Sequence, residues 1–488
     1  MKKISSLNFP FHIIFFSIQP ILFLYVKNAN QLNFEQVAKP IILTFIISSF
    51  IAIICKSKLN FTSITSLCIF FFYYQYLIYL KLNAFFTPLK FPINPFLFFI
   101  CSLLLLFLLI RTIYNKNVNS YFNIYSFFIL ISTVFYFDTF KKSISNKSET
   151  ISSSNNLRNS NKDIYYIILD GYPNSTTLKT EYGFDNHLFI NYLKNKKFYL
   201  VHNSISNYSL TFLSLASSLN WDYVNREIDD VKSIDRTTFY SLIQQNKTFN
   251  YLNKKGYTFI NLCSGWGPTQ FMKSADINIS LNNKVNEFTN ILLNTTILAY
   301  MKSYIPVLYT NTEVIDHSFS TLCKISLINK KKFVLAHILC PHDNFELVEP
   351  NDVITPSTFS RKALYIKTID SLNKKVIATL NSILNQSKEK PIIIVQSDHG
   401  TSFGFNEADW ANPTDKVLKD RMRNFSAIYF PDIDLADSLM TISPVNNFRL
   451  LLNNYFDEKL PILKDTSYFS NYIAPYKFKN VTEIVKFN

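Results

Sequence analysis

The chain has 488 residues, of which 48% are hydrophobic and 16% aromatic, and its formal net charge is +15. This length allows two or three domains. The first 160 residues carry 14 Lys or Arg against 3 Asp or Glu, whereas the remainder carries 35 against 31. Most basic residues therefore flank apolar segments, where they meet lipid headgroups or set topology. A nucleic-acid-binding protein would concentrate this charge on its soluble part, so we reject that class.

Five apolar segments in the first third of the chain predict membrane-spanning helices. Some are shorter than the roughly 20 residues that a bilayer core requires, so we expect their flanks to extend them. A signal peptide is rejected because no small-residue cleavage site follows the first segment and further spans come after it. The prediction is a helical membrane anchor over residues 1–140, with spans at about 11–26, 41–55, 62–80, 94–113 and 121–138.

The number of spans determines where the rest of the chain lies. With the N-terminus in the cytoplasm, five spans place everything after residue 140 outside, and the positive-inside bias of the loops is small. Four or six spans would reverse this orientation, and that alternative stays open. The composition, rich in Asn, Lys, Ile and Phe, suggests an AT-rich bacterial genome. We therefore predict a multi-pass protein of the bacterial cytoplasmic (inner) membrane with an extracytoplasmic C-terminal domain.

Residues 141–162 are polar, rich in Ser and Asn and without periodicity, which predicts a linker. From residue 163 short apolar runs alternate with amphipathic helical stretches. This alternation predicts one α/β domain over 163–488, with a mostly parallel sheet and helices on both faces. The expected strands are 164–169, 198–201, 257–262, 333–339 and 391–396, with helices near 236–255 and 360–387.

Polar residues of metal-binding or catalytic type follow three of these strands. Asp170 follows the first, His342 the fourth, and Asp398 with His399 the last. The carboxyl ends of parallel strands lie along one edge of a sheet, so these side chains should meet there. Divalent metals of the Zn or Mn kind accept such mixed carboxylate and imidazole ligands. For Asp398-His399-Gly400 alone, an Asx turn beside an ordinary buried histidine is an equally good interpretation.

A nucleophile is expected in residues 206–217, which resemble a loop entering a helix near Thr211. A hydroxyl at a helix N-terminus gains from the positive end of the helix dipole, and a metal would activate it further. On local sequence alone, Ser209 or Thr211 as a simple helix cap is the favoured alternative.

The six cysteines show no CxxC spacing and indicate no disulfide framework. Cys340, beside His342, is a candidate ligand or nucleophile, but a small buried residue at a strand end is the favoured interpretation.

Four motifs in this order resemble the sulfatase-like branch of the alkaline phosphatase superfamily. They are Leu-Asp-Gly (169–171), Asn-Tyr-Ser-Leu-Thr-Phe-Leu-Ser-Leu-Ala-Ser (207–217), Pro-His-Asp-Asn-Phe (341–345) and Ser-Asp-His-Gly (397–400). The anchor, linker and external domain are similar to the membrane transferases of that branch: lipoteichoic acid synthase and the phosphoethanolamine and phosphoglycerol transferases. The last motif is the most specific. The resemblance implies an alkaline-phosphatase-like fold.

The resemblance also implies roles for individual residues. Asp170, Asp398 and His399 would be metal ligands, together with Thr211 as the nucleophile. His342 matches a histidine that contacts the phosphate or protonates a leaving group. His337, on the same strand, is better explained as a core residue. The implied cofactor is a divalent metal, Zn²⁺ or Mn²⁺ first, with Mg²⁺ as a further option.

The sequence departs from these transferases at three points. Asp170 stands where they usually carry Glu, no further histidine follows residue 400, and the disulfides of some phosphoethanolamine transferases are absent. Sulfate-ester hydrolysis is not expected, because true sulfatases need a C/S-x-P-x-R motif that residues 263–267 do not match and Thr211 cannot undergo the required oxidation.

The predicted function is therefore metal-dependent transfer of a phospho-head-group from a membrane phospholipid to a cell-envelope glycan or lipid, through a phospho-Thr211 intermediate. Two alternatives stay open: a hydrolase that uses the same residues with water as acceptor, and a non-catalytic scaffold in envelope assembly. The sequence does not identify the head group, the acceptor or the native metal.

Overall fold

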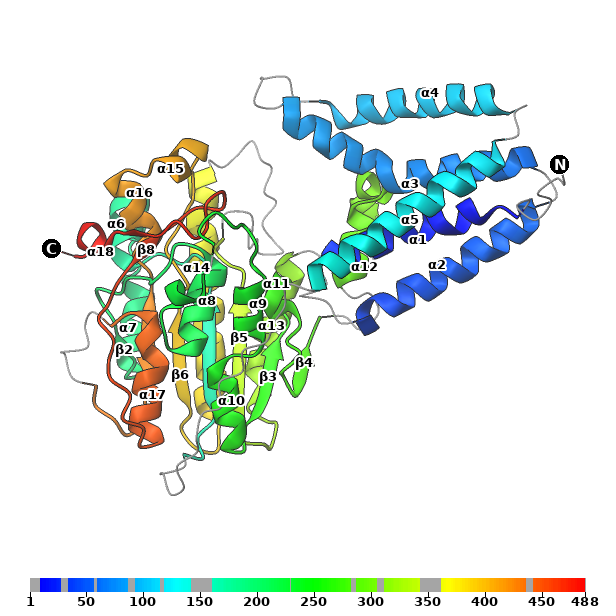
Figure 1. Cartoon of the computed structure of the whole chain (residues 1–488). Helices are drawn as coiled ribbons and strands as arrows, with labels where there is room; N and C mark the ends of the chain where they lie inside the picture. Colours follow the sequence, from blue (N-terminus) through cyan, green and yellow to red (C-terminus); the bar gives the residue numbers. More distant parts are fainter. Residues whose placement is uncertain are drawn as a thin grey trace. The chain divides into compact units, whose positions relative to one another are not determined.

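The structure is a computed structural model, and it forms two units (Figure 1). One holds residues 1–148 and 282–309, and the other holds 149–281 and 310–488. The residues that the structure describes are 9–27, 34–56, 59–86, 93–114, 118–141, 160–228, 230–281, 287–304, 311–342, 361–435 and 442–487. Most of the predicted linker therefore lies outside the described residues.

The first unit contains a helix at each of the five predicted spans. Three of these helices are long and apolar enough to cross a membrane, over 37–55, 61–83 and 95–113, and the first helix has a shorter apolar stretch. The chain is thus a membrane protein, while five spans and their orientation remain predictions. The helices are α1 (Phe11–Lys27), α2 (Phe34–Cys55), α3 (Leu59–Phe86), α4 (Pro95–Ile113) and α5 (Asn119–Lys141).

A buried polar cluster joins α1, α3 and α5. The His12 ring on α1 contacts Ser66 of α3 and Asn119 of α5, and Thr62 Oγ1 donates to Asn119 Oδ1 at 3.0 Å. Such side-chain hydrogen bonds hold helices together where the surrounding solvent supplies no hydrophobic driving force.

A segment from the middle of the chain packs within this helical unit. It consists of α12 (Glu287–Asn294) and the 3₁₀ helix η3 (Ile297–Tyr304). Phe288 and Leu292 are buried in one cluster with Ile21 of α1 and Val37 of α2. The amphipathic pattern of this segment does not differ from that of the helices in the α/β region, so the segment was included in the predicted domain 163–488.

Tyr300 makes the second contact of this segment. Its ring centroid lies 5.0 Å from that of Tyr76 on α3 and 5.2 Å from that of Phe99 on α4. Gln75 Nε2 also donates to the Tyr300 hydroxyl at 3.2 Å. Both apolar packing and a hydrogen bond therefore attach residues 287–304 to the helices of the anchor.

The second unit is built on a seven-stranded sheet of order β2-β7-β6-β1-β5-β3-β4. The five strands β1, β3, β4, β5 and β6 pair in parallel, whereas β7 is antiparallel to both β6 and β2. The predicted fold class, a helical anchor followed by an α/β domain with a mostly parallel sheet, is confirmed. The strands are β1 (Ile164–Leu169), β2 (Tyr199–Leu200), β3 (Thr258–Leu262), β4 (Ile277–Ile279), β5 (Lys332–Ile338), β6 (Ile392–Gln396) and β7 (Ser426–Tyr429).

Helices cover both faces of this sheet (Figure 1). Alternate β1 residues point to opposite sides: Tyr166 packs with α8 and α17, and Tyr165 packs in the cluster that contains α13 and α14. Because both faces are covered, the inner strands are apolar throughout, as their continuous apolar runs predicted. The helices of this unit include α8 (Thr211–Asn220), α9 (Thr237–Gln244), α10 (Lys247–Lys254), α13 (Asn311–Ile325), α14 (Arg361–Gln386), α15 (Glu407–Ala411), α16 (Asp415–Met422) and α17 (Asn447–Tyr455).

Candidate active site

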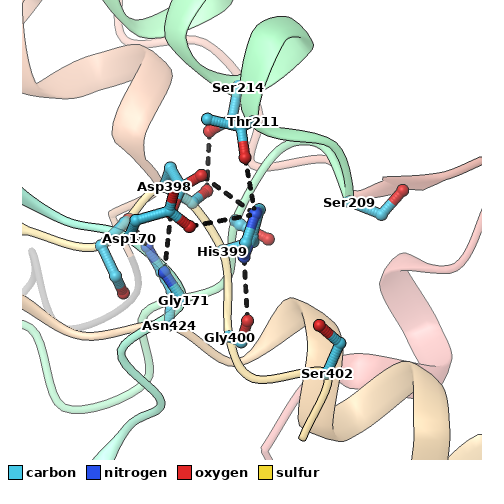
Figure 2. A network of polar contacts seen from close by, with 12 residues as sticks. Asp170, Gly171, Ser209, Thr211, Ser214, Asp398, His399, Gly400, Ser402 and Asn424 are labelled. Carbon is cyan, nitrogen blue, oxygen red and sulfur yellow. Dashed lines mark hydrogen bonds and ion pairs between the residues drawn. The ribbon is translucent and has the colours of Figure 1, made fainter. Parts of the chain in front are cut away.

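Three of the predicted site residues meet at the carboxyl edge of the sheet (Figure 2). Asp170 directly follows β1, and Asp398 and His399 follow β6, the parallel neighbour of β1. One ligand atom from each residue lies within 4.8 Å of the others. Asp170 is 2% exposed, and Asp398 and His399 are fully buried. The sheet topology therefore brings together residues that are more than 200 positions apart in the sequence.

The hydrogen bonds of His399 assign its tautomer. Its Nδ1 lies 2.9 Å from the Gly400 carbonyl oxygen, which can only accept, so the ring proton is on Nδ1. The opposite nitrogen, Nε2, then carries a lone pair and accepts from Arg421 Nη2 at 2.8 Å. A metal-ligating histidine has this tautomer, with its other nitrogen fixed by a carbonyl, and a metal would replace Arg421 as the partner of Nε2.

Two carboxylate oxygens face the same nitrogen. Asp398 Oδ2 lies 3.0 Å and Asp170 Oδ1 3.8 Å from His399 Nε2. Both oxygens are buried, and no described residue donates a hydrogen bond to either. The second oxygen of Asp398, Oδ1, accepts from the Gly171 amide at 3.0 Å, which orients the carboxylate. Buried, unsatisfied carboxylate oxygens beside an imidazole lone pair are the arrangement that a divalent cation stabilises, so these residues fit a metal.

Thr211 brings a hydroxyl to this group. It is the first residue of α8, and its Oγ1 lies 3.0 Å from His399 Nε2. Neither Thr211 nor Ser209 caps the helix. Leu210 occupies the N-cap position without a side-chain hydrogen bond, and Ser209 Oγ donates to Ser470 O at 2.7 Å. Thr211 Oγ1 thus lies at the positive end of the α8 dipole.

The position of α8 is fixed by a second hydroxyl of the same helix. Ser214 Oγ donates to the Asp398 backbone oxygen at 2.7 Å, which joins α8 to the end of β6 (Figure 2). Every residue of α8 is buried. The low dielectric around the helix therefore strengthens the electrostatic effect of its N-terminus on Thr211.

Gly400 allows the chain to pass close to the site. A Cβ at this position would lie 2.1 Å from the Asp420 carbonyl oxygen and 2.7 Å from that of Arg423. The Gly400 amide also donates to Arg421 O at 2.7 Å. Only glycine permits this approach, which brings residues 420–423 beside His399.

His342 lies next to the group by its backbone. A Cβ placed on Gly171 would be 3.9 Å from His342 Cα and 3.8 Å from His399 Cε1. Residues 343–345 of the same motif, like the chain up to 360, lie outside the described residues.

His337 is a hydrogen-bonded core histidine, as the favoured interpretation predicts, but it also touches the site. Its Nδ1 lies 2.9 Å from Thr269 Oγ1, and its Nε2 lies 3.4 Å from Asp170 Oδ2.

The contribution of Arg421 to the site was not predicted from the sequence. Its side chain is 1% exposed and holds three parts of the site together. Nε donates to Ser209 O at 2.8 Å, Nη1 to Ser402 Oγ at 3.1 Å, and Nη2 to His399 Nε2 at 2.8 Å. Arg421 precedes β7, and because β7 is antiparallel its beginning lies at the edge where β6 ends. The sequence carried no signal for that strand direction.

The charges of the site follow from burial and neighbours. Burial by itself would raise the pKa of Asp398, but its buried neighbours, with the Arg421 guanidinium among them, lower the pKa below its ordinary value. Asp398 is therefore a carboxylate at neutral pH. Burial raises the pKa of the Cys340 thiol, which agrees with a small core residue and not with a thiolate nucleophile.

Comparisons with known proteins found similarity in structure only. No family model matches the sequence, and no curated protein matches it. Among solved structures, the integral membrane lipooligosaccharide phosphoethanolamine transferase A (EptA) of Neisseria meningitidis is 13% identical, with a TM-score of 0.40 over 92% of this chain and 95% of that one. The C-terminal periplasmic domain of EptC from Escherichia coli, in complex with Zn, is 12% identical, with a TM-score of 0.46 over 67% and 95%.

A putative sulfatase of Bacteroides fragilis is a further neighbour, 14% identical, with a TM-score of 0.42 over 67% of this chain and 84% of that one. The neighbours thus include phosphoethanolamine transferases and members of the sulfatase and alkaline phosphatase group, the group that the motifs resemble. Because these TM-scores are below 0.5, the case for function rests on the side chains of the site.

Proposed function

We propose that the protein is a metal-dependent phosphotransferase that moves a phosphate-linked head group from a membrane phospholipid to a hydroxyl of a cell-envelope glycan or lipid. One observation carries the proposal: Thr211 Oγ1, Asp398 Oδ2 and Asp170 Oδ1 all face the unprotonated Nε2 of a buried histidine. A hydroxyl among unsatisfied carboxylates at a helix N-terminus is the arrangement of an activated nucleophile.

Asp170, Asp398, His399 and Thr211 would hold the metal, which, when bound, supplies Lewis acidity and offsets negative charge. The chain contributes the rest. The N-terminus of α8 stabilises negative charge on Thr211 Oγ1, and the buried Arg421 guanidinium adds a fixed positive charge beside His399. Gly171 and Gly400 keep the backbone close enough for these groups to meet.

The first half-reaction forms a bond between Thr211 Oγ1 and the phosphorus of the lipid phosphodiester. The bond from phosphorus to the lipid alcohol oxygen breaks, and the proton lost from Thr211 is balanced by the proton that this oxygen gains. His342, whose backbone adjoins the site, is the candidate to deliver that proton. In the second half-reaction the acceptor hydroxyl loses its proton as its oxygen bonds to phosphorus. The bond from phosphorus to Thr211 Oγ1 breaks, and Thr211 recovers a hydroxyl proton.

The test is the intact mass of the full-length protein in vesicles that contain bacterial phospholipids and Mn²⁺ or Zn²⁺. We expect a mass increment equal to the transferred group, absent in Thr211→Ala. The exposed Thr180 provides the matched control, and Thr180→Ala should carry the same increment as the natural protein. Full turnover by Thr211→Ala would overturn the proposal.

Two other results would select the alternatives. Released head groups without an increment or a transfer product would indicate a hydrolase with water as acceptor. Protein that binds no metal, gains no mass and releases nothing would indicate a scaffold.

A further inference from the structure

A row of two arginines and three aromatic rings runs beside the candidate active site. It begins at Arg421, whose Cζ lies 5.0 Å from the centroid of the Trp410 ring, and Trp410 lies 5.7 Å from Tyr472. The Arg236 Cζ follows, 5.3 Å from the Tyr472 centroid and 5.1 Å from that of Phe212. The row therefore starts at a residue that contacts His399 and ends at the residue after Thr211.

Among the described residues, Arg236 differs from Arg421 in having no polar partner for its side chain. Among the described residues none accepts a hydrogen bond from its guanidinium, and none forms an ion pair with it. Its neighbour in sequence, Asp235, is engaged elsewhere, because Asp235 Oδ1 accepts from the backbone N–H of Thr237 at 2.9 Å and from its hydroxyl. A guanidinium that packs against two rings and has no polar partner keeps its N–H edge available for an anion.

This edge can be reached from solvent. Arg236 is half-buried and Tyr472 is 44% exposed, whereas Arg421 is 1% exposed. Arg421 is thus a buried arginine that holds the candidate site together, and Arg236 is a solvent-accessible arginine beside it.

Arg236 contacts the residue next to the nucleophile. Thr211 and Phe212 are consecutive residues of α8, so their side chains diverge by roughly 100° around the helix axis. The Arg236 Cζ lies 5.1 Å from the centroid of the Phe212 ring. This arrangement favours a bound group other than the phosphate that reacts at Thr211.

We propose that Arg236, held between Phe212 and Tyr472, binds an anionic oxygen group, a phosphate or a carboxylate, of the acceptor molecule. This inference rests on the proposed transferase function and adds the class of acceptor: a hydroxyl compound that carries a negative charge near the hydroxyl. Bidentate recognition of such groups is the chemistry in which arginine is superior to lysine.

The kinetic test compares three acceptors offered to the full-length protein in phospholipid vesicles with Mn²⁺: glucose, glucose 6-phosphate and glucuronate. In Arg236→Gln we expect the ratio of kcat/KM for the charged acceptors to that for glucose to fall about tenfold, the loss of a charge-assisted hydrogen bond. The two charged acceptors distinguish phosphate from carboxylate recognition. Arg226→Gln removes the same charge from an exposed arginine that makes no ring contact among the described residues, and should leave the ratio unchanged.

A binding measurement decides the inference even if no transfer occurs. Glucose 6-phosphate and glucuronate are titrated into the full-length protein after metal removal by chelation, so that no metal competes for the anion. We expect Arg236→Gln to weaken binding of at least one of them about tenfold, and Arg226→Gln to leave it unchanged.

Equal binding by natural protein and Arg236→Gln would overturn the inference. An acceptor ratio unaltered by Arg236→Gln would do the same where transfer is seen. A protein that binds the charged sugars through Arg236 but forms no Thr211 adduct would instead refute the proposed function and leave the anion site standing.

Discussion

Asp398 is a charged residue without exposure to water, and its charge links the stability of the second unit to pH. Its pKa in the folded protein is below the unfolded value of about 3.9, so ionised Asp398 favours folding above that value. This contribution is lost as pH falls below about 4 towards the folded pKa, because the unfolded chain then binds the proton more readily.

We therefore expect the difference in thermal midpoint between natural protein and Asp398→Asn, both chelated and in detergent, to narrow as pH is lowered from 7 to 3. Asp432, with 70% of its side chain exposed, provides the control Asp432→Asn. A difference that stays constant or widens on acidification would contradict the assignment of a stabilising charge.

Prediction of individual site residues succeeded where a polar residue of metal-binding type directly follows a strand. Asp170 and Asp398 each follow an apolar run, so the edge rule for parallel sheets was enough to bring them together. Arg421 gave no such signal, because its place depends on the antiparallel direction of β7. Arg236 lay in a stretch read only as helical, and its two aromatic partners are at positions 212 and 472, which local sequence could not connect.

At the scale of elements, the contact between α8 and the end of β6 places the nucleophile relative to the carboxylates. It depends on the buried hydrogen bond from Ser214 Oγ to Asp398 O. Ser214→Ala should lower the free energy of unfolding by about 1 kcal/mol and slow formation of the Thr211 adduct. Ser218 is the matched control, because its hydroxyl donates at 2.8 Å to Ser214 O within the same helix.

Both quantities can be measured on the same preparations, by chemical denaturation and by intact mass over time. Ser218→Ala should form the adduct at the natural rate. If Ser214→Ala destabilises the protein but forms adduct as quickly as Ser218→Ala, the hydrogen bond stabilises the fold without positioning Thr211.

Element prediction was most accurate for the central strands. The predicted bounds of β1 and β6 agree with the observed strands to within one residue. Strands covered on both faces are apolar throughout, so the first and last apolar residues mark where each strand begins and ends. The short β4 was missed, since three half-buried residues at a sheet edge show no clear pattern. The helical stretch near 236–255 is two helices, α9 and α10, separated at Gln245 and Asn246, where Asn246 caps the second.

At the scale of the whole molecule, residues 282–309 belong with the anchor although they lie within the predicted 163–488 domain. A truncated protein of residues 163–488 would carry Phe288, Leu292 and Tyr300 without Ile21, Val37 and Tyr76, their packing partners. We expect it to self-associate in size-exclusion chromatography without detergent.

Replacing 282–309 in that truncated protein by a short Gly/Ser linker should restore a monomer, because the exposed apolar side chains are then gone. Monomeric behaviour of both truncated proteins would show that the segment does not depend on the anchor. No local pattern in the sequence could reveal this packing, because an apolar helical face does not specify which unit covers it.

The same arrangement has a consequence for biosynthesis. The α12 helix begins roughly 145 residues after α5 ends, an interval of about 7–30 s at the usual rates of chain elongation. During that time the helices of the anchor are inserted without Phe288, Leu292 and Tyr300, while β1, β3 and β4 still await β5, β6 and β7. Neither unit can complete its core before the other has begun, so membrane insertion and folding of the sheet proceed as one interleaved process.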